Sequence, residues 1–139
     1  MSMKIVVLDG YNAKGEELNF DFLKKYGEVA YYDRTAPEDV LNRIVDADMV
    51  LLNKVVLTRE IMAQCKKLKF VSILATGYNV VDVKAARDLG ITVSNVPYYS
   101  TASVAQLTFA FILEFASKVA THDESVHSGV WQNSKDFAY

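Results

Sequence analysis

Short apolar runs alternate with longer mixed segments through the first two thirds of the chain. The runs are rich in valine, isoleucine and leucine, which is typical of strands buried on both faces of a parallel sheet. The expected strands are residues 4–8, 29–32, 49–52, 70–74 and 91–93. Each pair of runs is separated by enough residues for one short helix.

The segments between the runs place apolar residues at helical spacing, so we expect each to bury one face of a helix. The first expected helix is 17–26, with an inner face formed by Leu18, Phe22, Leu23 and Tyr26 and with Gly27 as its stop. The second starts near Pro37 and buries Val40, Leu41, Ile44 and Val45. The third follows the N-cap Thr58 and buries Ile61, Met62 and Cys65. The fourth covers 82–89 and ends at a left-handed Gly90.

Strands that alternate with helices through short linkers indicate βαβ units and a parallel sheet. Five such strands predict an α/β fold, a doubly wound sheet of the flavodoxin-like kind, over residues 1–97. In sheets of this kind ligands bind outside the carboxyl ends of the strands. The loops after the first, third and fourth strands are therefore the places to look for chemistry.

The last third of the chain follows a different pattern. Residues 101–120 predict a long helix that is apolar on nearly every side, with a thin polar stripe of Ser103, Gln106, Glu114 and Ser117. Such a helix must be covered all round. We therefore assign residues 98–139 to a hinge, an interdomain or dimerisation helix and the start of a second domain that continues beyond residue 139.

Composition excludes several function classes. The chain has 15 basic and 17 acidic side chains, a formal charge of −2 and no basic block, so nucleic acid is not an expected partner. The apolar stretch 104–115 is too short to cross a bilayer, and the N-terminus does not resemble a signal peptide, so we expect a cytoplasmic protein. The single cysteine, Cys65, is expected to be a buried apolar residue.

The loop after the fourth expected strand, Ala75-Thr76-Gly77-Tyr78-Asn79, is the most informative candidate site. A glycine just past a strand lets backbone N–H groups point outward and form a small anion-binding concavity that suits a carboxylate. Asn53-Lys54, after the third strand, adds a positive charge at the same edge. The alternative is that Gly77 only closes a tight turn and that Lys54 is an ordinary solvated residue.

Several ordered motifs resemble one family. The run from Leu74 to Asp82 (LATGYNVVD) is followed by GITVSNVP at 90–97, YST at 99–101, SVAQ at 103–106 and GVW at 129–131, with Asn53-Lys54 and Leu57-Thr58 upstream. Together they resemble the D-isomer-specific 2-hydroxyacid dehydrogenases, and within them the glycerate dehydrogenases or hydroxypyruvate reductases. The resemblance covers essentially the whole chain. It implies an oxidoreductase that reduces small 2-oxo acids, such as hydroxypyruvate and glyoxylate, with NADH or NADPH.

The resemblance also implies roles for individual residues. The N–H groups of Thr76 and Gly77 would hold the substrate carboxylate beside Tyr78, with Asn53 and Lys54 as further substrate contacts. Thr76 and Thr108 would touch the cofactor, Val96-Pro97 would begin the hinge, and the complete enzyme would be a homodimer. Two positions depart from the family pattern: Val80 replaces an asparagine or histidine, and Tyr98 stands where a small residue is common, which suggests a differently shaped cleft.

The rest of the machinery that the resemblance implies lies beyond residue 139. The six glycines form no Gly-x-Gly turn, and the catalytic arginine, glutamate and histidine of the family have no counterpart here. His122 and His127 stand five apart in a polar tail, a poor spacing for a metal site, so we predict neither a metal nor a catalytic role for them. We expect this chain alone neither to bind NADH tightly nor to oxidise it.

Three other interpretations remain. A receiver-type phosphorylation module needs an aspartate at the end of strand three, where this chain has Asn53. A flavin carrier needs a Ser/Thr-rich phosphate loop after strand one, which residues 9–13 imitate only weakly. A noncatalytic interaction or small-ligand-binding module fits the apolar helix, and the state of self-association would bear on it.

Overall fold

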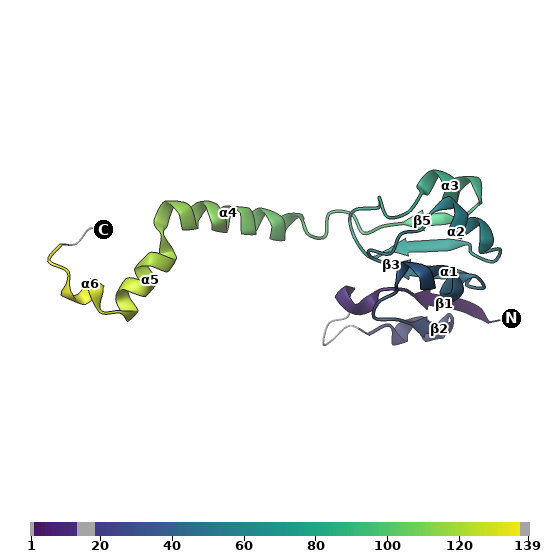
Figure 1. The fold of residues 1–139 in the computed structure, drawn as a ribbon, viewed down its shortest axis with the longest axis horizontal. Helices are drawn as coiled ribbons and strands as arrows, with labels where there is room; N and C mark the ends of the chain where they lie inside the picture. The colour runs from purple at the N-terminus through teal and green to yellow at the C-terminus, as the bar shows by residue number, and fades with distance from the viewer. Residues whose placement is uncertain (1, 14–18, 137–139) are drawn as a thin grey trace. The chain divides into compact units, whose positions relative to one another are not determined.

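The computed structural model describes residues 2–13 and 19–136 and divides the chain into two compact units, Met1–Tyr98 and Tyr99–Tyr139 (Figure 1). The first unit is built on a parallel five-stranded sheet in the order β2-β1-β3-β4-β5. Its strands are β1 Met3–Val7, β2 Gly27–Tyr31, β3 Met49–Leu52, β4 Phe70–Ile73 and β5 Thr92–Ser94. This order confirms the flavodoxin-like α/β fold, and every strand lies within two residues of its predicted bounds.

Alternate residues of the strands point to opposite faces of the sheet and feed two separate cores. Val6, Val50 and Ile73 face the larger core, which is covered by α1 (Val40–Ile44), α2 (Arg59–Gln64) and α3 (Val83–Asp88). Ile5 and Val7 face the smaller core, which Phe20 and Leu23 complete on the other side. The helices thus lie mainly on one face of the sheet.

The prediction of an α-helix at 17–26 is wrong for the described residues of that range. Residues 17 and 18 lie outside the described residues, and Asp21–Lys25 forms a 3-10 helix, η2, instead of an α-helix. The core takes Phe20 and Leu23, which are three residues apart as one 3-10 turn requires, while Phe22 and Tyr26 are more than half exposed. Phe20 packs on the ring of Tyr31, with 5.4 Å between ring centroids.

The sequence suggested that Gly27 ends a helix. In the structure Gly27 is instead the first residue of β2. Its φ is not left-handed, and a Cβ at this position would collide with the carbonyl oxygen of Met3 on the neighbouring strand. The glycine is therefore explained by the close approach of β2 to β1.

The signals for the other three helices hold, with one exception. Pro37 begins a 3-10 turn, η3 (Pro37–Asp39), that leads into α1, where Val40 and Ile44 are buried but Val45 is exposed, contrary to the prediction. The Thr58 side chain caps α2 by accepting a hydrogen bond from Ile61 N at 3.4 Å. Gly90 has φ of +73° after α3, as its left-handed role predicted.

Cys65 is buried at the end of α2, as predicted. Its Sγ donates a hydrogen bond to the Ile61 carbonyl oxygen at 3.3 Å. Burial raises the pKa of the thiol, because the charged thiolate is disfavoured away from water. The side chain therefore behaves as a core residue in the protonated form.

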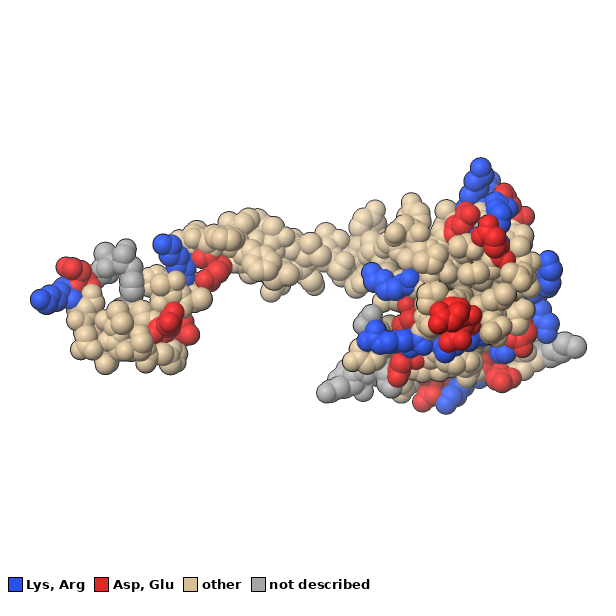
Figure 2. Space-filling model, viewed as in Figure 1, with Lys and Arg blue, Asp and Glu red and all other residues tan. Residues whose placement is uncertain are grey.

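The second unit consists of α4 (Thr101–Ser117), α5 (Val119–His127) and α6 (Val130–Asn133). The helix predicted at 101–120 ends three residues early, because Lys118 adopts a left-handed conformation with φ of 48° and breaks the chain direction. None of the residues of α4 is buried. Figure 2 shows it almost free of charged atoms, in contrast to the charged surface of the first unit.

The apolar character of α4 raises the question of whether it could span a membrane. Among the described residues, no single helix is both long and apolar enough to cross a bilayer. The pair formed by α4 and α5 reaches the required length and composition only when counted together, across a bend of 58°.

Candidate functional site

The loops that follow β1, β3, β4 and β5 all leave the same edge of the sheet, because the strands are parallel. The order β2-β1-β3-β4-β5 makes the loop after β1 a neighbour of the loop after β3. It likewise makes the loop after β4 a neighbour of the segment after β5. The candidate site residues of the first unit therefore belong to two pairs of adjacent loops.

The loop after β4 has two consecutive backbone N–H groups that form no hydrogen bond with the described residues. Among the described residues, the backbone N–H groups of Thr76 and Gly77 donate no hydrogen bond, and both residues are exposed. Consecutive amides that have no hydrogen bond within the protein can donate to the oxygens of an anion without first breaking a protein hydrogen bond. Tyr78, 57% exposed, follows directly.

The carbonyl groups and the hydroxyl of this loop are fixed by the segment that follows β5. Asn95 Nδ2 donates to Thr76 O at 2.8 Å, and Thr76 Oγ1 donates to Val96 O at 3.1 Å. Val96 N completes the clamp by donating to Ala75 O at 3.1 Å. The loop is therefore held through its carbonyl groups and the Thr76 hydroxyl, whereas the N–H groups of Thr76 and Gly77 form no hydrogen bond with the described residues. This role of Asn95 was not predicted, and the position of Asn95 after the strand adjacent to β4 was the only signal for it.

Gly77 does not need to be glycine for backbone reasons. Its φ lies outside the left-handed region, and an added Cβ would meet only Asn79 Oδ1, at 3.4 Å, which is an ordinary contact. Turn closure alone therefore does not explain the residue. A Cβ here would instead occupy open space beside the unbonded amides.

Asp9, two residues after the end of β1, organises the loop after β3. Its carboxylate accepts hydrogen bonds from three consecutive N–H groups: Asn53 N at 2.6 Å, Lys54 N, and Val55 N at 3.2 Å. These amides are consumed, so Asn53 and Lys54 are left with only their side chains for a substrate. Asn53 is partly buried and Lys54 is exposed. This role of Asp9 was not predictable from local sequence, because its partners are 44 to 46 residues away.

We expect Asp9→Asn to lower the free energy of unfolding by about 1.5–3 kcal/mol. One carboxylate oxygen serves Asn53 N and the other serves Lys54 N and Val55 N, and an amide side chain replaces one of them with a donor. Urea unfolding followed by circular dichroism measures the loss. Glu38→Gln, at an exposed acid that forms no hydrogen bond with the described residues, is the control and should change stability by less than about 0.5 kcal/mol. Equal losses in both variants would contradict the assignment.

The remaining sequence candidates lie elsewhere. Thr108 is on α4, and its Oγ1 donates to Val104 O at 2.9 Å within the same helix. His122 and His127 are on α5, where His127 Nδ1 is 3.3 Å from Asp123 Oδ1. The described parts of the chain hold no group of three or more His, Cys, Asp or Glu side chains that could bind a metal.

The two departures from the family pattern have clear structural settings. Val80 packs against the larger core, and its carbonyl oxygen accepts a hydrogen bond from Leu57 N at 2.9 Å. Tyr98, the last residue of the first unit, has φ of 63°, which is unfavourable for a bulky side chain, and is 83% exposed. The strained residue therefore lies at the boundary between the two units.

Comparison with known proteins adds to this picture. The model of the D-isomer-specific 2-hydroxyacid dehydrogenase catalytic domain matches residues 5–135. A hydroxypyruvate reductase of Blautia hydrogenotrophica is 46% identical over 99% of the chain, and a glycerate dehydrogenase of Methylorubrum extorquens is 31% identical over 100% of it. The chain spans 44% of the length of each of these relatives.

A similar fold occurs in an acyclic imino acid reductase solved with NADPH and D-arginine. The two share 27% sequence identity and align with a TM-score of 0.75, over 91% of this chain and 41% of the reductase. The family model matches residues 5–135 and the structural alignment covers 91% of the chain, so both include residues of the two units.

Proposed function

Because this chain belongs to the D-isomer-specific 2-hydroxyacid dehydrogenase family, we propose that it supplies the substrate-binding part of an oxidoreductase. The complete enzyme reduces small 2-oxo acids, with hydroxypyruvate and glyoxylate as the substrate class, to D-2-hydroxy acids. Residues 1–97 form the substrate domain, and 98–139 form the hinge, a dimerisation helix and the beginning of a nucleotide-binding domain. The similarity to a hydroxypyruvate reductase and a glycerate dehydrogenase supports this choice.

The observation that carries the proposal is the pair of unbonded, exposed N–H groups at Thr76 and Gly77. Two such amides orient the carboxylate of a 2-oxo acid and so fix the position of the carbonyl carbon next to it. The exposed ammonium group of Lys54 increases the attraction for the acid. Asn53 and Tyr78 are the remaining side chains that we assign to the substrate.

The reduction also needs a cofactor, for which this chain has only a partial site. NADH or NADPH, when bound, supplies the hydride. The described residues form no glycine-rich phosphate cradle, and the hydroxyl groups of Thr76 and Thr108 already donate to backbone carbonyls. These two threonines can offer a cofactor only their free lone pairs. The role of this chain is therefore to bind and orient the acid.

A chimera tests the proposal directly. Residues 1–139 are joined to the part of the Blautia hydrogenotrophica reductase that follows the matched segment, which restores the remaining length. We expect the chimera to oxidise NADH or NADPH when hydroxypyruvate or glyoxylate is added, and the 139-residue chain alone to show no turnover. A folded chimera that binds the dinucleotide but reduces no small 2-oxo acid would refute the proposed function.

We also propose that α4 pairs with a second copy of the chain. Its exposed apolar side chains are Val104, Leu107, Phe109, Phe111, Ile112, Leu113 and Phe115. An apolar surface of this extent is typical of an interface. A noncatalytic interaction module would expose the same surface, so the chimera assay separates the two functions and sedimentation tests the pairing.

Sedimentation is expected to give a dimer or larger species for the chain of 15.6 kDa. Phe111→Ser combined with Phe115→Ser, four residues apart on one face of α4, should shift the protein to the monomer, because the apolar contact area is lost. Gln106→Ala, on the polar stripe, should leave the association unchanged. A wild-type monomer at high concentration would contradict the pairing.

A further inference from the structure

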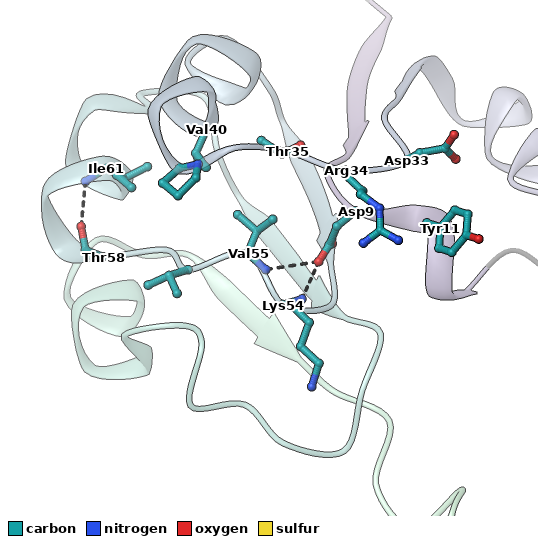
Figure 3. A pocket seen from close by; sticks show the side chains of 12 residues that line it. Asp9, Tyr11, Asp33, Arg34, Thr35, Val40, Lys54, Val55, Thr58 and Ile61 are labelled. Atoms are coloured by element: carbon teal, nitrogen blue, oxygen red, sulfur yellow. Dashed lines mark hydrogen bonds between the residues drawn. The ribbon is translucent and has the colours of Figure 1, made fainter.

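A pocket of about 530 Å³ lies at the carboxyl edge of the sheet and does not include the loop 75–79. Figure 3 shows it between the loop that leads into α1 and the loop that leads into α2, with Asp9 at its base. Its apolar wall consists of Pro37, Val40, Val55, Val56 and Ile61. The pocket occupies the crevice next to the ends of β1 and β3, where the chain connections change from one face of the sheet to the other.

The pocket is held open by backbone hydrogen bonds between its loops. Gly10 N donates to Tyr32 O at 3.0 Å, and Tyr11 N donates to Asp33 O at 3.2 Å. Asp9 fixes the loop after β3 in the same way, through Asn53, Lys54 and Val55. The walls therefore do not have to be ordered by a ligand, which lowers the entropic cost of binding.

Both acidic side chains of the pocket already have internal partners. The Asp9 carboxylate accepts three backbone N–H groups, and Asp33 Oδ1 accepts a hydrogen bond from Tyr31 Oη at 3.0 Å. The N–H dipoles around Asp9 offset its negative charge locally. Both carboxylates therefore already accept hydrogen bonds from groups within the protein.

The two basic side chains of the pocket have no acidic partner in the described part of the chain. Within the described residues neither Arg34 nor Lys54 forms an ion pair, and the Arg34 guanidinium instead lies 4.6 Å from the centre of the Tyr11 ring. Stacking on Tyr11 restrains Arg34 while its N–H donors remain available. In Figure 3 the side chain of Lys54 extends away from the apolar wall. Arg34 is therefore the main cation that a ligand in this pocket would meet.

From these contacts we infer that the pocket is a second ligand site, for a small amphipathic organic acid. The carboxylate of the ligand pairs with the guanidinium of Arg34, and its branched or cyclic apolar body packs against Val55, Val56 and Ile61. The site binds acids through their apolar part and needs no 2-oxo group. Its ligand preference therefore differs from that of the site formed by the amides of Thr76 and Gly77. Because the loop 53–55 borders the pocket and carries Lys54, occupancy changes the surroundings of a proposed substrate contact.

Backbone amide NMR of the 139-residue chain tests the inference with isocaproate as the probe. We expect saturable shifts at Tyr11, Arg34, Val56 and Ile61, with a dissociation constant on the order of millimolar, as the small size of the probe allows. The neutral analogue 4-methyl-1-pentanol should bind about tenfold more weakly, because it lacks the charge that pairs with Arg34. Oxalate, which has no apolar body, should leave these signals unchanged.

Arg34→Gln should weaken isocaproate about tenfold and leave the alcohol unaffected. Arg87→Gln, at an exposed arginine of α3 that forms no ion pair with the described residues, is the matched control and should bind like the wild type. Val56→Asp, at a residue that is 56% exposed, places a negative charge in the pocket without touching the core and should also reduce binding. The inference fails if isocaproate shifts no pocket signal, shifts only residues 76–79, or binds the Arg34 variant as tightly as the wild type.

Discussion

Replacing Gly77 with alanine is expected to raise the KM of the chimera for hydroxypyruvate by about tenfold or more, while the fold stays intact. The new methyl group enters the space beside the N–H groups of Thr76 and Gly77, where the acid is proposed to bind. Stability should not fall, because the φ of Gly77 suits alanine and the Cβ meets only Asn79 Oδ1 at 3.4 Å. The free energy of unfolding of the 139-residue chain should rise by up to about 1 kcal/mol.

Gly90→Ala is the reciprocal control. Gly90 has φ of +73° with open space around it, so alanine is strained there although nothing obstructs it. We expect a loss of roughly 1 kcal/mol of stability and an unchanged KM for hydroxypyruvate. If Gly77→Ala destabilised the chain and left KM alone, the glycine would be serving the turn and not the substrate.

Ile73→Ala is expected to have the largest effect on stability, a loss of about 3 kcal/mol or more in the free energy of unfolding. The side chain is fully buried in the larger core, at the end of β4, between β3 and β5. Truncation removes buried apolar area and leaves a cavity that the paired strands cannot close. Urea unfolding with the slope held constant measures it.

Two variants bracket that result. Ile73→Val should cost only about 1 kcal/mol, since it removes one methyl group. Leu89→Ala, at a side chain that is 40% exposed, should cost clearly less than Ile73→Ala. A change below about 1 kcal/mol for Ile73→Ala would contradict the packing described for the larger core.

The strands were predictable because each contains a short apolar run, and the runs of β1, β3 and β4 supply the buried residues of the sheet. The helices were less predictable, because periodicity identifies apolar residues but does not show which of them are buried in the core. Leu23 is buried as expected, but Phe20 is buried with it, whereas Phe22 and Tyr26, which were expected inside, are exposed. Gly27 was misinterpreted for a related reason: a glycine required by the backbone of a neighbouring strand has the same sequence signal as a glycine that ends a helix.

Part of the candidate site could likewise be predicted from the sequence, and part could not. The loop at Thr76 and Gly77 follows a strand directly, so its position could be predicted from local sequence. The groups that hold the loops, Asp9 and Asn95, act across neighbouring strands, and their partners depend on a strand order that spacing alone does not reveal. The break at Lys118 was missed because lysine has no general preference for the left-handed conformation it adopts there.

A crystal structure of the chimera with oxamate, a nonreducible analogue of a 2-oxo acid, tests the central claim most directly. We predict that the oxamate carboxylate lies within hydrogen-bond distance, about 2.7–3.2 Å, of the backbone nitrogens of both Thr76 and Gly77. Oxamate bound elsewhere in the chimera, with those two amides still facing solvent, would contradict the claim.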